Sequence, residues 1–264
     1  LAGSNSTLTT YGIIIGGEDH LMAGKFKIDM SALDRGLDRM IGTIICDENG
    51  VEVNRITEHD IEKTEKAWLS LSEKAIRERD GSAFMWAVGN ELRARHLWNN
   101  MFLLRDHGMF EAALVATFTT TWNNPLWRSY VPMDVWRFFL ELADRERLRS
   151  CGDPLPHPGP FTLYRGVSGR GKARRVKGYS WTGTLDSARW FAGVMSYSDA
   201  NLPDPAVYVV TVPDSAVLFY THERNEDEYV LEPSALRPRK IEMVTREQYE
   251  SIQKARLGRK GKTA

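Results

Sequence analysis

Three short motifs in the second half of the chain bring together residue types that suit ligand binding and catalysis. In the first, Tyr164-Arg165-Gly166, the arginine offers a rigid bidentate fork that suits a diphosphate. The glycine lets a flat ligand approach the main chain closely. In the second, Ser180 and Thr182 share one face of a predicted strand, because alternate residues of a strand point to the same side.

The third motif is an acidic turn that runs into an apolar strand and contains Glu226 and Glu228. By the same alternation these two carboxylates share one face. Each motif alone has an ordinary explanation, such as a half-exposed sheet face or a solvated turn. Three such motifs on three separate strands of one β segment are far less easily accidental, and together they predict a site.

The three motifs resemble those of the Arg-Ser-Glu class of ADP-ribosyltransferases, the family of clostridial-type toxins and arginine-specific transferases. That pattern is an aromatic-Arg-Gly strand, a Ser-x-Thr or Ser-x-Ser strand, and a Glu-x-Glu turn. The resemblance covers residues 160–245, with Thr182 in place of a second serine. It implies a mono-ADP-ribosyltransferase that moves ADP-ribose from NAD⁺ to a macromolecular acceptor and releases nicotinamide, in a toxin or effector of bacterial or phage type.

The resemblance also implies roles for the motif residues. Glu228 would bind the ribose hydroxyls and stabilise the positive charge that builds on the sugar as its bond to nicotinamide breaks. Ser180 would hold Glu228 in place by a hydrogen bond. Arg165 would grip the NAD⁺ phosphates, and the main chain of Gly166 would bind the nicotinamide amide. Glu226 would orient or deprotonate the acceptor, for which a protein arginine is the first expectation.

Further residues are expected around this NAD⁺ site. A predicted helix over residues 185–193 carries an arginine suited to phosphate and an aromatic ring suited to nicotinamide, and two side chains just before the acidic turn are candidates for acceptor recognition. The additional cofactor-binding candidates are Tyr164, Thr182, Arg189 and Phe191, and the substrate-binding candidates are Tyr220 and His222. The chemistry requires no metal.

Other functions remain open at this stage. A basic loop over residues 170–177 and the C-terminal residues 237–264, with nine Lys or Arg against three Glu, would suit RNA or DNA as the acceptor. A basic run of this kind is otherwise typical of a solvated tail. A catalytically inactive NAD⁺-binding or interaction module, and NAD⁺ hydrolysis without an acceptor, are further alternatives. An inhibitor or antitoxin protein is a possible partner.

Composition places the chain among packed globular proteins. It has 264 residues, 42% of them hydrophobic, and a formal net charge of zero, so it is not as a whole an electrostatic trap for nucleic acid. No apolar run is long enough for a membrane span and no signal peptide is evident. Cys46 and Cys151 lack partners at metal-ligand spacing and are expected to be buried, reduced thiols. We therefore expect a cytoplasmic protein, including one delivered into a target cell, without metal or membrane.

Hydrophobic patterning predicts an α+β fold in which an N-terminal helical bundle precedes a β core. The resemblance implies that this core is a split, mixed or antiparallel sheet of ADP-ribosyltransferase type. The expected divisions are an irregular, β-containing segment (1–57), a helical bundle (58–152), a catalytic core (153–245) and a basic tail (246–264). Within the first, residues 11–15 are expected to form a strand and residues 47–50 a hairpin turn.

Helices are predicted from residue 58, over 82–100, over 101–120 and over 133–149. Four prolines in residues 153–160 mark the boundary after the bundle. Strands are predicted over 161–164, 179–182, 206–212, 216–220, 228–231 and 241–245, with a helix over 185–193 capped by Thr184.

Overall fold

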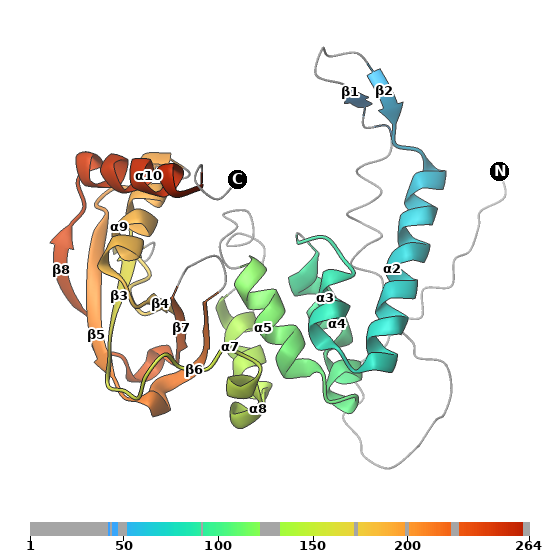
Figure 1. Ribbon diagram of the computed structural model, residues 1–264, viewed down its shortest axis with the longest axis horizontal. Helices are drawn as coiled ribbons and strands as arrows, with labels where there is room; N and C mark the ends of the chain where they lie inside the picture. The colour runs from blue at the N-terminus through green and yellow to red at the C-terminus, as the bar shows by residue number, and fades with distance from the viewer. Residues whose placement is uncertain are drawn as a thin grey trace.

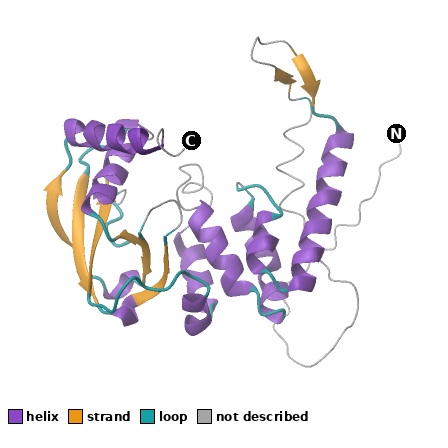
Figure 2. Cartoon of the chain, viewed as in Figure 1, coloured by secondary structure: helices purple, strands orange, loops and turns teal. Residues whose placement is uncertain are grey.

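The fold is of the α+β class, with a helical bundle followed by an antiparallel sheet (Figures 1 and 2). It is given by a computed structural model of the chain. The residues that the structure describes are 42, 44–46, 52–90, 92–121, 133–171, 174–198, 201–222 and 227–260. In these ranges every helix is too short or too polar to cross a bilayer.

A two-stranded hairpin and a long helix open the described part of the chain. Strands β1 (Ile44–Cys46) and β2 (Glu52–Arg55) pair antiparallel on either side of the predicted turn, which itself lies outside the described residues, as does the strand predicted over 11–15. Helix α2 (Glu58–Glu78) begins at the predicted residue because Thr57 and Asp60 form a reciprocal capping box.

The remaining bundle helices are shorter than predicted, because the helix is interrupted within each expected range. They are α3 (Gly81–Trp86), α4 (Arg93–Asp106), α5 (Phe110–Thr121), α7 (Met133–Leu142) and α8 (Arg145–Ser150). The predicted helices over 82–100, 101–120 and 133–149 are therefore wrong in their extent.

Two of the helix breaks have clear local causes. Gly108 has a φ of 69° after the end of α4, a left-handed conformation that glycine adopts at helix ends. Asp144 caps α8 by accepting a hydrogen bond from the main-chain N–H of Arg147 at 2.9 Å, which starts a new helix where the sequence pattern suggested a continuous one.

Six strands form the antiparallel sheet, in the order β6-β7-β4-β3-β5-β8. Their bounds are β3 (Phe161–Val167), β4 (Ser180–Thr182), β5 (Ala206–Val212), β6 (Val217–Thr221), β7 (Glu228–Leu231) and β8 (Arg239–Met243). The strands predicted over 206–212 and 228–231 match the structure at both ends. Helix α9 (Leu185–Gly193) also matches, and Thr184 caps it as predicted, by accepting from the N–H of Ser187.

The bundle packs directly onto one end of the sheet. A single hydrophobic core joins helical residues such as Phe118 to Phe219 of β6 and Val230 of β7. The rings of Phe118 and Phe219 meet edge to face, with centroids 5.6 Å apart. Figure 1 shows α5, α7 and α8 beside β6 at this end, while α9 and α10 lie toward the other strands. The bundle therefore stabilises the sheet by sharing a hydrophobic core with β6 and β7.

Two expectations about the periphery differ from the structure. The segment predicted to be a basic tail contains helix α10 (Arg246–Lys260), which packs against α9. One of its arginines, Arg256, lies 4.1 Å over the ring of Trp190, so part of the basic charge is used in packing. Cys151 is a free thiol, but it is exposed rather than buried as predicted, because it lies at the end of α8 where the chain leaves the bundle. The side chain of Cys46 lies outside the described residues.

Candidate active site

The three motifs lie on three adjacent strands in the middle of the sheet. Strand β4 pairs with β3 through Tyr164 and Thr182, and with β7 through Thr182 and Glu228. Since directly opposed residues of antiparallel strands point to the same side, these side chains share one face with Ser180. Segments that are up to 64 residues apart in the sequence thus meet at one place in the fold.

Ser180 and Glu228 are joined by a short hydrogen bond. The hydroxyl of Ser180 donates from Oγ to Oε1 of Glu228 at 2.5 Å. Glu228 is only 9% exposed, and Thr221 of β6, which lies opposite it on its other side, is buried as well. Because a buried carboxylate requires hydrogen-bond donors to offset its lost hydration, the contact stabilises Glu228 in this position.

Arg165 of β3 contacts the main chain of β4 at Ser180. Alternation gives its side chain the face of β3 opposite to that of Tyr164, yet its Nη1 donates to the main-chain carbonyl of Ser180. Its Nε donates to the carbonyl of Arg175 at 3.2 Å. Ser180 is therefore the junction of the site: its carbonyl accepts from Arg165 and its hydroxyl donates to Glu228.

Gly166 has a packing role that sequence reasoning did not find. A Cβ atom at this position would lie 1.8 Å from the carbonyl oxygen of Ala188 and 2.7 Å from the nitrogen of Ala192, both in α9. The missing side chain is therefore required by the close approach of α9 to β3. Tyr164, two residues earlier on the same face of β3, is half-buried and packs against the core that α9 forms with β5.

Thr182 lies within the group of motif residues, whereas the position of Glu226 is not described. Thr182 is buried directly opposite Glu228, and its Oγ1 accepts from the N–H of Thr184 at 3.3 Å. It thereby joins the end of β4 to the start of α9. Glu226, the expected acceptor residue, lies outside the described residues.

Arg189 is directed toward the edge strand β8, and Phe191 meets its neighbour Trp190 edge to face. The guanidinium of Arg189 forms a bidentate pair with Glu242 of β8, from Nε to Oε1 at 2.6 Å and from Nη2 to Oε2 at 2.9 Å. Strand β8 is at the edge of the sheet, far from β7. The half-buried ring of Phe191 lies 4.9 Å from that of Trp190. The structure therefore gives Arg189 a structural partner in Glu242 and Phe191 a ring contact with Trp190.

Asp227 organises the two candidates that precede the acidic turn. Its Oδ1 accepts from the hydroxyl of Tyr220 at 2.7 Å and lies 2.8 Å from Nδ1 of His222. The main-chain N–H of His222 donates to Asp153 at 2.6 Å. Burial and the carboxylate of Asp227 raise the pKa of Tyr220 above its ordinary value. Adjacent residues of an extended chain point to opposite faces of a sheet, so this cluster lies on the face opposite to that of Glu228. The sequence alone contains this signal, because Asp227 directly precedes Glu228.

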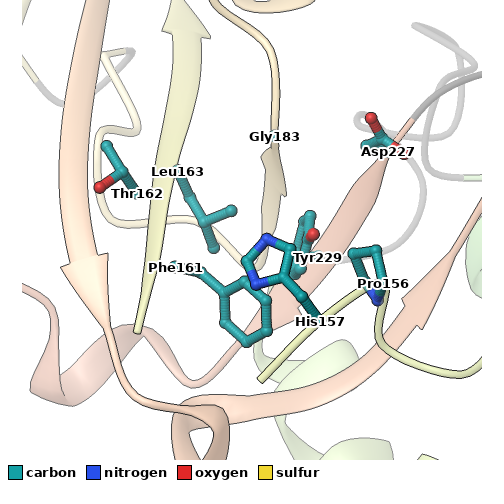
Figure 3. A pocket seen from close by; sticks show the side chains of 8 residues that line it. All are labelled: Pro156, His157, Phe161, Thr162, Leu163, Gly183, Asp227 and Tyr229. Carbon is teal, nitrogen blue, oxygen red and sulfur yellow. The ribbon is translucent and has the colours of Figure 1, made fainter. Parts of the chain in front are cut away.

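A cavity of about 280 Å³ opens on that opposite face (Figure 3). Phe161 and Leu163 of β3 lie on one side of it and Tyr229 of β7 on the other (Figure 3), beside Gly183, which directly follows the end of β4. Figure 3 shows the ring of His157 beside that of Phe161, with Asp227 toward the rim. Neither Ser180 nor Glu228 lines this cavity, so it is distinct from the site that the motif residues form.

The described residues contain no group of three or more His, Cys, Asp or Glu side chains that could bind a metal ion. Comparisons with protein-family models, with curated proteins and with solved structures find no match to this chain.

Proposed function

We propose that this protein is an NAD⁺-dependent mono-ADP-ribosyltransferase of the Arg-Ser-Glu type, with a core of that fold, that modifies a macromolecular acceptor. The observation that carries the proposal is the junction at Ser180. One serine on the central strand accepts from Arg165 through its carbonyl and donates to Glu228 through its hydroxyl. These are the three residues that the sequence motifs single out, and they come from three neighbouring strands.

The donor and acceptor set fits NAD⁺ chemically. A carboxylate suits ribose hydroxyls, and a guanidinium suits a diphosphate. When bound, NAD⁺ supplies ADP-ribose through cleavage of its bond to nicotinamide. Glu228 acts as a fixed negative charge beside the sugar, where positive charge develops. Ser180 keeps that carboxylate from rotating, and Arg165 holds the phosphates. Because the side-chain position of Gly166 is occupied by α9, only its main chain contributes to the nicotinamide end.

A protein arginine is the proposed acceptor. The support is the Glu226-x-Glu228 spacing, in which the resemblance assigns the first glutamate to the acceptor. Asp227, directly before Glu228, accepts from Tyr220 and contacts His222, the two residues that the sequence predicts as candidates for acceptor recognition. Glu226 would orient or deprotonate the guanidinium of the acceptor.

A nucleic-acid acceptor is the second candidate, favoured by one specific observation. Arg175 and Lys177 are exposed in the loop whose main chain holds Arg165. Two other basic residues of this loop, Arg170 and Arg174, are held by Asp204. Basic charge therefore lies beside the proposed site, where it would attract a polyanion.

Incubation with labelled NAD⁺ tests the proposal and separates the acceptor classes. The wild-type protein and the Glu228→Gln variant are each given cell-lysate protein, purified RNA or purified DNA as acceptor. Label transfer and nicotinamide release are measured in the same reactions. Label on protein that depends on Glu228 and is prevented by excess agmatine, a competing guanidine acceptor, supports transfer to arginine. Label on nucleic acid that falls steeply with salt supports the second candidate.

Two further outcomes separate the remaining alternatives. Nicotinamide release without label on any acceptor identifies NAD⁺ hydrolysis. Absence of both label and nicotinamide release from the folded wild-type protein overturns the enzyme proposal and leaves a binding or interaction module.

A further inference from the structure

We infer that Gly178 is a positioning residue for Arg165: the absence of a side chain at residue 178 is what lets the Arg165 guanidinium lie across the main chain that leads into β4. The inference concerns a residue outside the three motifs. It rests on the proposed function only for its consequence in NAD⁺ binding, because the contact itself is a feature of the fold.

The geometry at Gly178 leaves no room for a side chain. A Cβ atom built there would lie 2.3 Å from Nη2, 2.5 Å from Cζ and 3.0 Å from Nε of Arg165. All three atoms belong to the guanidinium, at the end of a flexible side chain, so an added methyl group would be accommodated by displacement of Arg165. The φ angle of Gly178 lies outside the left-handed region, so alanine meets no backbone strain there. Contact with Arg165, not backbone conformation, is thus the reason for glycine.

The main chain at Gly178 is itself firmly held. The indole Nε1 of Trp181 donates to the carbonyl of Gly178 at 2.9 Å, and Trp181 is 1% exposed within the core of the sheet. The next residue, Tyr179, is buried in the core shared with the helical bundle. Gly178 therefore cannot retreat from the guanidinium without disturbing two cores.

These contacts form a chain of support from the core to the proposed phosphate-binding group. Trp181 fixes Gly178, and the surface of Gly178 fixes one side of the Arg165 guanidinium. The carbonyls of Arg175 and Ser180, which accept from Nε and Nη1, then set the rotation of the guanidinium in its own plane. A planar cation held in this way presents its donors in one orientation, which is the condition for bidentate recognition of a diphosphate.

The substitution Gly178→Ala, with Gly183→Ala as a matched control, tests the inference. A Cβ at Gly183 would meet Asp227 and Tyr229 at 3.4 Å, an ordinary van der Waals distance, at the other end of the same strand. We expect Gly178→Ala to raise the KM for NAD⁺ by about ten- to hundredfold, as for loss of one charged hydrogen bond, with a smaller change in kcat. Gly183→Ala should leave both constants nearly unchanged.

A double-mutant cycle with Arg165→Lys separates positioning from a general effect on the fold. Lysine lacks the guanidinium that the added methyl group would displace, so Gly178→Ala should have little further effect in the Arg165→Lys background. An equal fold-change in both backgrounds would overturn the inference.

A readout that needs no turnover keeps this inference separate from the proposed function. The ¹⁵N–¹H resonance of Arg165 Nε, assigned by its loss in Arg165→Lys, should shift or exchange faster in Gly178→Ala and stay in place in Gly183→Ala. If the wild-type protein does not consume NAD⁺, the proposed function fails while this resonance still decides the role of Gly178. An Arg165 resonance that is unchanged in Gly178→Ala refutes the role.

Discussion

The hydroxyl of Ser180 and the carboxylate of Glu228 are hydrogen-bonded diagonally across β4 and β7, although the residue directly opposite Glu228 in the sheet is Thr182. The bond spans the two strands at the point where they carry the second and third motifs. Glu228 is buried, so this contact is a main determinant of where its charge lies. The consequences for activity and stability can be measured separately.

Loss of the Glu228 charge should abolish most NAD⁺ turnover while the fold remains. Glutamine keeps the size and an acceptor oxygen for Ser180 but removes the charge that we propose stabilises the developing cation, so we expect kcat for nicotinamide release to fall by about 10²- to 10³-fold. The control is Glu250→Gln, which alters an exposed carboxylate of α10. Equal activity of Glu228→Gln and the wild-type protein would contradict the assignment.

Removal of the Ser180 hydroxyl should have a smaller effect. In Ser180→Ala the carboxylate of Glu228 is retained but loses a hydrogen-bond donor, and we expect kcat to fall by about tenfold, as for loss of a charge-assisted hydrogen bond. The double variant Ser180→Ala with Glu228→Gln should be little worse than Glu228→Gln alone. Additive losses would show that Ser180 acts independently of Glu228.

Gly166→Ala should destabilise the protein. The methyl group would overlap the main chain of α9 near Ala188, and overpacking of this kind costs about 3 kcal/mol or somewhat more in free energy of unfolding. Chemical denaturation measures the loss, with Gly183→Ala as a control substitution that the surrounding space accepts. If Gly166→Ala were fully stable and only NAD⁺ binding were lost, the glycine would serve the ligand rather than the packing of α9.

Tyr220 should contribute to a loss of stability at alkaline pH. Its pKa is raised in the folded protein by burial first and by the hydrogen bond to Asp227 second. Because the unfolded chain releases the phenolic proton near pH ~10, the stabilising effect is complete below that pH and is lost as pH rises beyond it. Tyr179 and Tyr229 share this direction. Tyr220→Phe should therefore reduce, not remove, the alkaline slope of unfolding free energy, and an unchanged slope would contradict the prediction.

The pairing of Arg189 with Glu242 should couple the two residues in stability. The pair is bidentate and its side chains are only 25% and 22% exposed, so a cycle of Arg189→Gln and Glu242→Gln should give a coupling of about 1 kcal/mol. The KM for NAD⁺ provides the second readout. An increase in KM in Arg189→Gln that Glu242→Gln does not share would restore the phosphate-binding role expected from the sequence.

Local patterns were sufficient for many elements of this fold. The helix over 185–193 has an apolar face and a Thr184 cap, and the strands over 206–212 and 228–231 are short apolar runs between turn residues. Each of these signals acts within a few residues, so the sequence contains the whole cause. Two helices predicted in the bundle are too long, because the periodic apolar pattern was given more weight than local signals. Gly108 follows the end of α4, and Asp144 caps the start of α8.

The sequence by itself determined the types of the motif residues and, through the period of two in a strand, which neighbours share a face. The resemblance implied the hydrogen bond from Ser180 to Glu228, but only the tertiary structure decided that the carbonyl of Ser180 also accepts from Arg165. Strand order and register depend on contacts between distant segments. The tertiary structure also decided that Gly166 makes room for α9, that Gly178 makes room for Arg165 and that Arg189 pairs with Glu242. A missing side chain or a charge acquires its role from whatever the fold places beside it, and local sequence does not contain that neighbour.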